Sequence, residues 1–98
     1  MSIDVCVRPE ARADIEQAAA WYERQKPQLG EAVLDEVLDT FDRIAEDPQL
    51  YPVVHRQTRR AVIHRFPFGV FYRIEDDAIV VLAVIHGSRD PRAWQQRS

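Results

Sequence analysis

The side chains best suited to chemistry are concentrated in the second half of the chain. Residues 51–98 carry eight arginines, no lysine and all three histidines. A guanidinium presents a planar fork of N–H donors that matches the oxygens of a phosphate or a carboxylate. An imidazole exchanges protons near neutral pH. These residue types favour either recognition of an anionic partner or acid–base catalysis on a phosphodiester.

A metal-independent RNase is the enzymatic alternative that these residues leave open. His86 would move protons, and the arginines available to stabilise charge on the phosphate are Arg65, Arg73 and Arg89. Tyr72 is the sequence neighbour of Arg73, so the two point to opposite faces of a strand. Other hydrolases are excluded because the chain has no nucleophile-elbow serine, no histidines at metal-ligand spacing and no glycine-rich phosphate loop. We therefore expect no metal site and no cofactor.

A strand pattern over about residues 59–65 places basic side chains on both faces. Side chains two apart share a face of a strand, so Arg59 and Arg65 are expected on one face. Arg60 and His64 are then expected on the other. No continuous basic stripe results, which weakens the case for a nucleic-acid groove and leaves solvated edge arginines as the plain alternative.

The segment from residue 86 to residue 97 holds the densest cluster of polar and aromatic side chains. The proline after Asp90 can open a short terminal helix with Trp94 on its inner face. In a purely structural interpretation, Trp94 packs as a lid and Arg89 pairs with Asp90. In the functional interpretation, His86 and Arg89 open onto a shared surface next to the covered face.

Hydrophobic periodicity predicts the elements that position these side chains. The expected elements are a strand over 3–7, a helix from Pro9 to 26–27, a second helix from about 28 or 31 to 45, a loop over 48–57, and strands over about 59–65, 70–75 and 78–85. The short link between the helices predicts an antiparallel hairpin, and short turns force the last strands to be antiparallel. We therefore expect one α+β domain over residues 1–98. Its helical hairpin would pack on a mainly antiparallel sheet of about four strands, followed by a short C-terminal helix or tail.

The last predicted strand is apolar on both faces. Its side chains are Ile79, Val81, Ala83 and Ile85 on one face and Val80, Leu82 and Val84 on the other. A strand without a polar face must be covered twice. The helical hairpin can cover one face of the sheet. The loop over 48–57, the C-terminal tail or a partner chain must therefore cover at least part of the other.

The net charge of −3 hides an asymmetry between the two halves of the chain. Residues 1–50 hold five basic and twelve acidic side chains (net −7), whereas 51–98 hold eight basic and four acidic side chains (net +4).

Cys6 is the only cysteine and lies between two valines, so we expect a small core residue and neither a disulfide nor a thiolate metal site. The N-terminus has no signal-peptide pattern and the longest apolar run is eight residues, which predicts a cytoplasmic protein without a membrane span.

Short motifs along nearly the whole chain resemble, in their order, the RelE/ParE superfamily of toxins from bacterial toxin–antitoxin systems. The motifs are Pro9-x-Ala11-x-x-Asp14-Ile15, Trp21-Tyr22, Leu29-Gly30, Asp47-Pro48-x-x-Tyr51-Pro52, Arg59-Arg60, Phe66-Pro67-Phe68-x-Val70-x-Tyr72-Arg73, and Val81-Leu82-Ala83-Val84-x-His86-x-x-Arg89-Asp90-Pro91-x-x-Trp94. Each motif is weak alone, and their common order is fairly specific. The fold of the superfamily agrees with the one expected from the residues.

The resemblance implies a toxin that an antitoxin holds inactive. The C-terminal segment of such an antitoxin is usually disordered alone and wraps the toxin, which would complete the second cover of the sheet. We therefore expect the isolated chain to self-associate, co-expression with the antitoxin to rescue it, and the two proteins to form a higher-order complex.

The superfamily has two functional classes. ParE-like members poison DNA gyrase without hydrolysis, and RelE-like members cut messenger RNA on the ribosome. The single lysine, the acidic net charge and the Gly87-Ser88 pair, where a close RNase match would place a tyrosine, favour the ParE-like class. A RelE-like endonuclease and a degenerate domain that only binds its antitoxin remain alternatives. The side chains expected to contact the target or the antitoxin are Arg59, Arg60, Arg65, Arg73, His86, Arg89 and Trp94.

Overall fold

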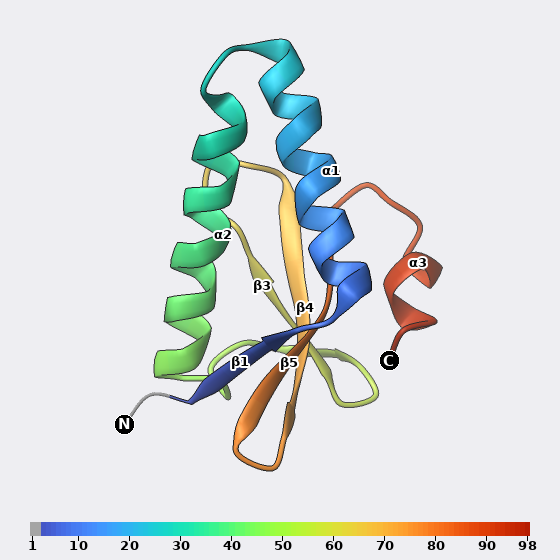
Figure 1. Cartoon of the computed structure of the whole chain (residues 1–98). Coiled ribbons are helices and arrows are strands. Elements are labelled where there is room, and N and C mark those ends of the chain that lie inside the picture. Colours follow the sequence, from blue (N-terminus) through green and yellow to red (C-terminus); the bar gives the residue numbers. More distant parts are fainter. Residues whose placement is uncertain (1–2) are drawn as a thin grey trace.

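The computed structural model describes residues 3–98 and places a helical hairpin against one face of a five-stranded sheet (Figure 1). The elements are β1 Asp4–Val7, α1 Pro9–Gln25, α2 Leu29–Glu46, β2 Val53–His55, β3 Thr58–Val62, β4 Phe68–Glu75, β5 Ala78–His86 and α3 Arg92–Gln95. The expected α+β architecture is confirmed. Met1 and Ser2, which belong to the N-terminal stretch examined for a signal peptide, lie outside the described residues.

The hairpin is fixed by specific contacts between its two helices. α1 begins at Pro9, whose locked φ suits the first turn and whose missing N–H is not needed there. The carboxylate of Glu23 accepts hydrogen bonds from the backbone N–H groups of Gln28 and Gly30, each at 3.0 Å, and so caps the start of α2. A Cβ on Gly30 would lie 2.6 Å from the carbonyl oxygen of Ala19. The helices therefore approach so closely that only glycine fits at this contact.

The strand order is β1-β5-β4-β3-β2, and only the β1–β5 pair is parallel. The strand count exceeds the expected four because the segment predicted as a loop over 48–57 contains β2. β2 pairs with β3 at the edge of the sheet, and the Pro52 carbonyl accepts the N–H of Arg60 at 3.1 Å. An edge position tolerates the preceding proline, which has no N–H to give to the ladder.

A β-bulge between β4 and β5 changes which side chains of β5 face the helices. Leu82 is the extra residue, so two residues of β5 oppose one of β4. The expected alternation holds as far as Val81. Beyond the bulge Val84 joins the core under the helices, whereas Ala83 and Ile85 face the opposite side. The prediction that residues 79, 81, 83 and 85 share one face is therefore wrong past Val81.

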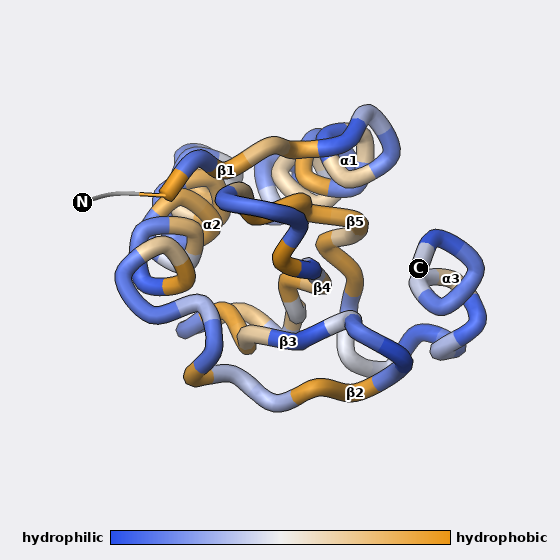
Figure 2. The backbone as a smooth tube through the Cα atoms, turned by 90° about the horizontal axis from the view of Figure 1, so that it is seen from below, coloured by the Kyte–Doolittle hydropathy of each residue, from blue (hydrophilic) through white to orange (hydrophobic). Residues whose placement is uncertain are grey.

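The chain itself covers part of the second face of the sheet. Trp94 of α3 is 7% exposed and stacks on Phe71 with ring centroids 4.3 Å apart. Ala83, Ile85 and Val54 of β2 complete this smaller cluster. Figure 2 shows α3 on the other side of the sheet from α2. Both chain segments expected as possible covers therefore contribute, and a partner is not needed to shield this part of the sheet.

Candidate functional site

Four of the seven residues predicted to contact a partner meet at one groove. The groove has a volume of about 250 Å³ and lies on the face of the sheet that packs against α3, away from α1 and α2; we call it the His86 groove. Arg60, His86, Arg89 and Trp94 belong to it. The complete lining is Arg60, Val62, Pro67, Phe68, Gly69, Phe71, His86, Gly87, Arg89, Pro91 and Trp94. Basic side chains and an aromatic floor thus share one concave surface.

The position of Arg60 in this groove depends on Gly69 of the neighbouring strand β4, which is diagonal to Arg60 and opposite Val62. A Cβ on Gly69 would lie 3.2 Å from Cγ and Cδ of Arg60 and 3.3 Å from the ring of Phe71. The missing side chain lets the aliphatic stem of Arg60 lie across β4 beside that ring. From the sequence, Gly69 is interpreted as a turn residue. In the structure it lies within β4, which begins at Phe68. The aromatic floor of Phe68 and Phe71 was not among the predicted site residues.

The imidazole of His86 has a defined tautomer. Its Nδ1 accepts the backbone N–H of Ser88 at 3.0 Å and lies 2.7 Å from the Ser88 hydroxyl. A backbone N–H can only donate, so Nδ1 carries no proton and the neutral ring carries its proton on Nε2. The ring packs edge-on against Phe68 with centroids 5.4 Å apart. His86 therefore presents a hydrogen-bond donor to its surroundings through Nε2.

Arg89 does not pair with Asp90, contrary to the structural interpretation of the sequence. Asp90 accepts the backbone N–H of Arg92 at 2.9 Å and pairs with the Arg92 guanidinium at 2.8 Å. These hydrogen bonds lower the pKa of Asp90. The Asp90 carboxylate lies at the start of α3, where the backbone N–H of Arg92 has no acceptor within the helix. The carboxylate therefore binds both the backbone and the side chain of Arg92 rather than Arg89. Within residues 3–98 no ion pair involves the guanidinium of Arg89.

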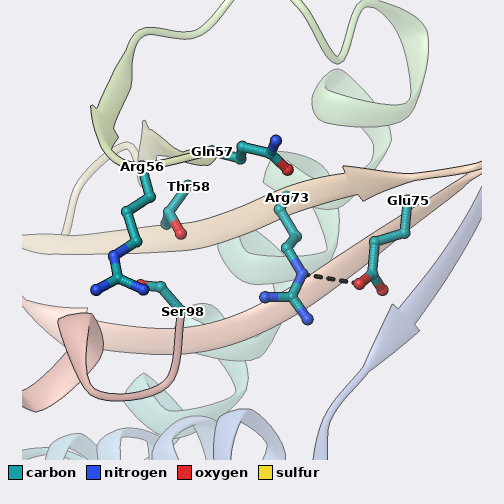
Figure 3. A pocket seen from close by; sticks show the side chains of 6 residues that line it. All are labelled: Arg56, Gln57, Thr58, Arg73, Glu75 and Ser98. Carbon is teal, nitrogen blue, oxygen red and sulfur yellow. Dashed lines mark hydrogen bonds and ion pairs between the residues drawn. The ribbon is translucent and has the colours of Figure 1, made fainter.

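Arg73 lies in a second groove on the same face of the sheet. We call it the Arg73 groove; its volume is about 520 Å³ and it is lined by Arg56, Gln57, Thr58, Arg73, Glu75 and Ser98. Arg73 donates from Nε to Glu75 at 3.0 Å (Figure 3). Arg73 and Glu75 therefore share a face of β4. Arg73 and His86 nevertheless line different grooves.

Arg59 of β3 has a structural role, because its side chain binds the loop that precedes β2. It donates from one Nη to the carbonyls of Gln49 and Tyr51, at 3.1 and 2.7 Å. The neighbouring Tyr72 hydroxyl donates to the Pro48 carbonyl at 2.6 Å, and burial raises the pKa of Tyr72 to about 12. These contacts hold the loop against the core. Neither side chain lines the His86 groove.

Arg65 and His64 are not where the strand pattern predicted them. β3 ends at Val62, and Arg65 has a left-handed φ of 73° in the following turn. The guanidinium of Arg65 lies 5.3 Å from the centroid of the Phe66 ring. His64 lies 3.1 Å from Nη1 of Arg43 on α2, so it does not share the face of Arg60. The period-two rule fails here because the chain leaves the strand three residues earlier than expected.

The remaining chemical expectations concern cysteine, metals and membranes. Cys6 is exposed, not a core residue, because the outward face of β1 is uncovered at this position. Residues 3–98 contain no group of three or more His, Cys, Asp or Glu side chains that could hold a metal ion. None of the described helices is both long and apolar enough to cross a membrane.

A strand, a helical hairpin, a mostly antiparallel sheet and a short C-terminal helix together form the fold of RelE/ParE-like toxins. The sequence profile of the family described as ParE toxin of type II toxin–antitoxin system, parDE, matches residues 5–91, and the chain belongs to that family.

Solved structures share this fold with the chain. One of them is from the chromosomal ParDE toxin–antitoxin system of P. aeruginosa: it is 15% identical, the match covers 87% of this chain and 96% of that one, and the TM-score is 0.77. Another is from the RelBE2 toxin–antitoxin complex of Mycobacterium tuberculosis: it is 23% identical, the match covers 88% of this chain and 99% of that one, and the TM-score is 0.60. No curated protein sequence matches the chain.

Proposed function

We propose that this ParE-family toxin acts in the cytoplasm by binding and inhibiting DNA gyrase, without cutting RNA, and that a cognate antitoxin neutralises it. The observation that carries the proposal is the hydrogen bond that engages Nδ1 of His86 as an acceptor. RNA cleavage needs a group that accepts a proton at the scissile phosphate. The Nδ1 of His86 already accepts the N–H of Ser88, and its Nε2 is a donor. Protonation at Nδ1 would break that hydrogen bond.

The arrangement of the other RNase candidates supports the same conclusion. Of the four residues in that hypothesis, only His86 and Arg89 line the His86 groove. Arg73 lines the Arg73 groove, and Arg65 lies over Phe66 in the turn after β3. The Tyr72 hydroxyl is directed to the loop carbonyl of Pro48. The candidates of the RNase hypothesis are thus divided between two grooves and a turn, which supports the non-hydrolytic proposal.

The His86 groove instead has the features of a protein-recognition surface. Its lining includes the buried aromatic residues Phe71 and Trp94 and the exposed arginines Arg60 and Arg89. Aromatic residues and arginine are the types that dominate binding energy at protein interfaces. A partner segment that combines an apolar anchor with acidic side chains would match this lining.

Induction of the chain alone in bacteria tests the proposal. Gyrase inhibition predicts a DNA-damage response and filamentous cells, both suppressed when the antitoxin is co-expressed. An Arg60→Gln/Arg89→Gln double variant should weaken the effect, whereas Arg12→Gln/Arg24→Gln, which removes the same charge from exposed positions on α1, should not. Rapid translation arrest with cleaved messenger RNA would contradict the proposal. Absence of any growth effect in the parent chain would indicate a degenerate antitoxin-binding domain.

A RelE-like endonuclease is the second candidate because His86 and Arg89 do share a groove. In that case the Ser88 turn must open to free Nδ1 of His86. Replacement of His86 and Arg73 by Ala should then abolish toxicity. Toxicity that persists in this double variant would exclude the endonuclease.

A further inference from the structure

The Arg73 groove is not used by the function proposed above. It is formed by the turn between β2 and β3, by β4 and by the end of the chain segment after α3. Figure 3 shows the guanidinium groups of Arg56 and Arg73 extending to the same side of the sheet, with Ser98 beside Arg56. Segments far apart in the sequence thus bring several hydrogen-bond donors to one cavity.

These donors lack partners within residues 3–98. The side chain of Arg73 is only 22% exposed, and its Nε bonds to Glu75 while both Nη groups make no hydrogen bond. Arg56 takes part in no side-chain hydrogen bond or ion pair in the described chain. The hydroxyl of Ser98 is buried and has no partner. Buried polar groups are normally satisfied, so the hydroxyl of Ser98, unpartnered among the described residues, points to an external acceptor. The Nη groups of Arg73 and the exposed guanidinium of Arg56 line the same groove and are available to that acceptor.

The donors of the groove select the kind of acceptor. Among the lining side chains, Arg73 is paired with Glu75, whereas Arg56 has no ion-pair partner in the part of the chain that the structure describes. A carboxylate accepts hydrogen bonds from two guanidinium forks and adds only one negative charge. A nucleic-acid backbone would bring several phosphates close to Glu75 and to a chain whose net charge is −3. The lining therefore favours a carboxylate over a polyanionic strand.

We infer that the Arg73 groove binds one Asp or Glu side chain from an acidic segment of a protein partner, held between Arg56 and Arg73 with the Ser98 hydroxyl as a further donor. The inference needs a protein partner, as the proposed function does. It does not need gyrase to be the target. The groove would act as a second attachment point beside the His86 groove, because Trp94 lines one groove and Ser98 of the same terminal segment lines the other.

Fluorescence anisotropy with labelled peptides tests the groove directly in the full chain. The probes are a short Glu/Ala peptide, the same peptide with every Glu replaced by Gln, and an oligo-dT strand. The acidic peptide should bind, and its affinity should fall as salt rises. Arg56→Asn should weaken binding about tenfold through the loss of one charge-assisted contact. Asparagine suits the left-handed φ of 53° at this position, so the variant is expected to fold.

Three further variants show whether the peptide binds in the Arg73 groove, in the His86 groove or elsewhere on the surface. Arg73→Gln should weaken binding like Arg56→Asn, whereas Arg24→Gln on the exposed face of α1 should leave it unchanged. Loss of binding in Arg60→Gln but not in Arg56→Asn would place the peptide in the His86 groove and overturn the inference. Equal binding of the Gln peptide, tighter binding of oligo-dT, or no binding of any probe would also overturn it. None of these results depends on activity against gyrase, so failure here is distinct from failure of the proposed function.

Discussion

Arg97 donates a 2.6 Å hydrogen bond to Asp14, which lies 83 residues earlier in the chain. The Asp14 side chain is 8% exposed and that of Arg97 is 22% exposed. Asp14 also accepts the N–H of Val84 at 3.0 Å, and Arg97 also donates to the carbonyl of Leu82 at 3.2 Å. These backbone groups belong to β5 beyond the point where β1 stops pairing with it. The ion pair thus completes the open edge of β5 and ties the segment after α3 to α1.

Asp14→Ala should therefore destabilise the fold strongly. The substitution leaves the guanidinium of Arg97 and the N–H of Val84 without their acceptor, and loss of one partner from such a pair costs about 3 kcal/mol. Urea unfolding measures the change in the free energy of unfolding. Glu16→Ala removes an exposed carboxylate from the same helix and should change it by less than about 0.5 kcal/mol. Equal stability of the two variants would show that the pair contributes nothing.

Gly69→Ala should impair partner binding more than stability. The added methyl lies within 3.3 Å of Phe71 and closer still to the stem of Arg60, so both must shift in the His86 groove. We expect gyrase inhibition to weaken roughly fivefold, which corresponds to about 1 kcal/mol. Glu16→Ala is the control because it changes an exposed side chain of α1 that does not line the His86 groove. Unaltered inhibition in Gly69→Ala would remove Arg60 and Phe71 from the binding surface.

Ionisation of Tyr72 should lower the free energy of unfolding in alkaline solution. Its folded pKa of about 12 lies above the ordinary value of 10.0, so the folded state keeps a proton that the unfolded state loses. The stabilisation is complete below pH 10 and is lost as the pH rises from 10 to about 12, by roughly 2 kcal/mol in total. Tyr72→Phe should be less stable at neutral pH by about 1 kcal/mol, through loss of the bond to Pro48, and should lack this part of the pH slope. Unfolding curves recorded across this pH range check both effects.

His86→Gln should retain toxicity in cells. Glutamine replaces the Nε2–H donor of the imidazole with an amide N–H but cannot act as a general acid or base. If the toxin works by binding, induction should arrest growth about as strongly as in the parent chain. An RNase would lose on the order of 10²- to 10⁴-fold in rate, and growth would recover. The growth curves of the two strains therefore separate the mechanisms.

The start of α1 and the end of α2 could be predicted because a proline with one dominant conformational preference marks each of them. Pro9 fixes the start of α1, and Pro48 pushes Asp47 out of the helical region at the end of α2. The turn between β4 and β5 carries a similar local mark, because aspartate tolerates a positive φ and Asp76 has a φ of 52°. Local signals of this kind do not depend on the rest of the fold.

The bulge at Leu82 could not be predicted, because β5 is apolar on both faces. A shift of register by one residue leaves no polar side chain on the wrong side, so the pattern carries no mark of it. Arg65 was misplaced because an arginine with φ of 73° gives no sign in the sequence that the strand has ended.

The grooves were predictable only where their residues are near in sequence. His86 and Arg89 lie three residues apart after one strand, and they do share a groove. The convergence of Arg56, Arg73 and Ser98 depends on the turn before β3 and on the path of the chain after α3. No sequence periodicity connects these three positions, so only the folded structure shows that they line one groove.

The most direct test of the proposed function is the supercoiling of relaxed plasmid DNA by purified gyrase in the presence of the purified chain, with and without antitoxin. We expect supercoiling to be inhibited in proportion to the toxin added, and an equimolar amount of antitoxin to restore it. Messenger RNA on translating ribosomes should remain intact in a parallel reaction. Full gyrase activity at toxin excess, with ribosome-dependent cleavage of the messenger, would contradict the account.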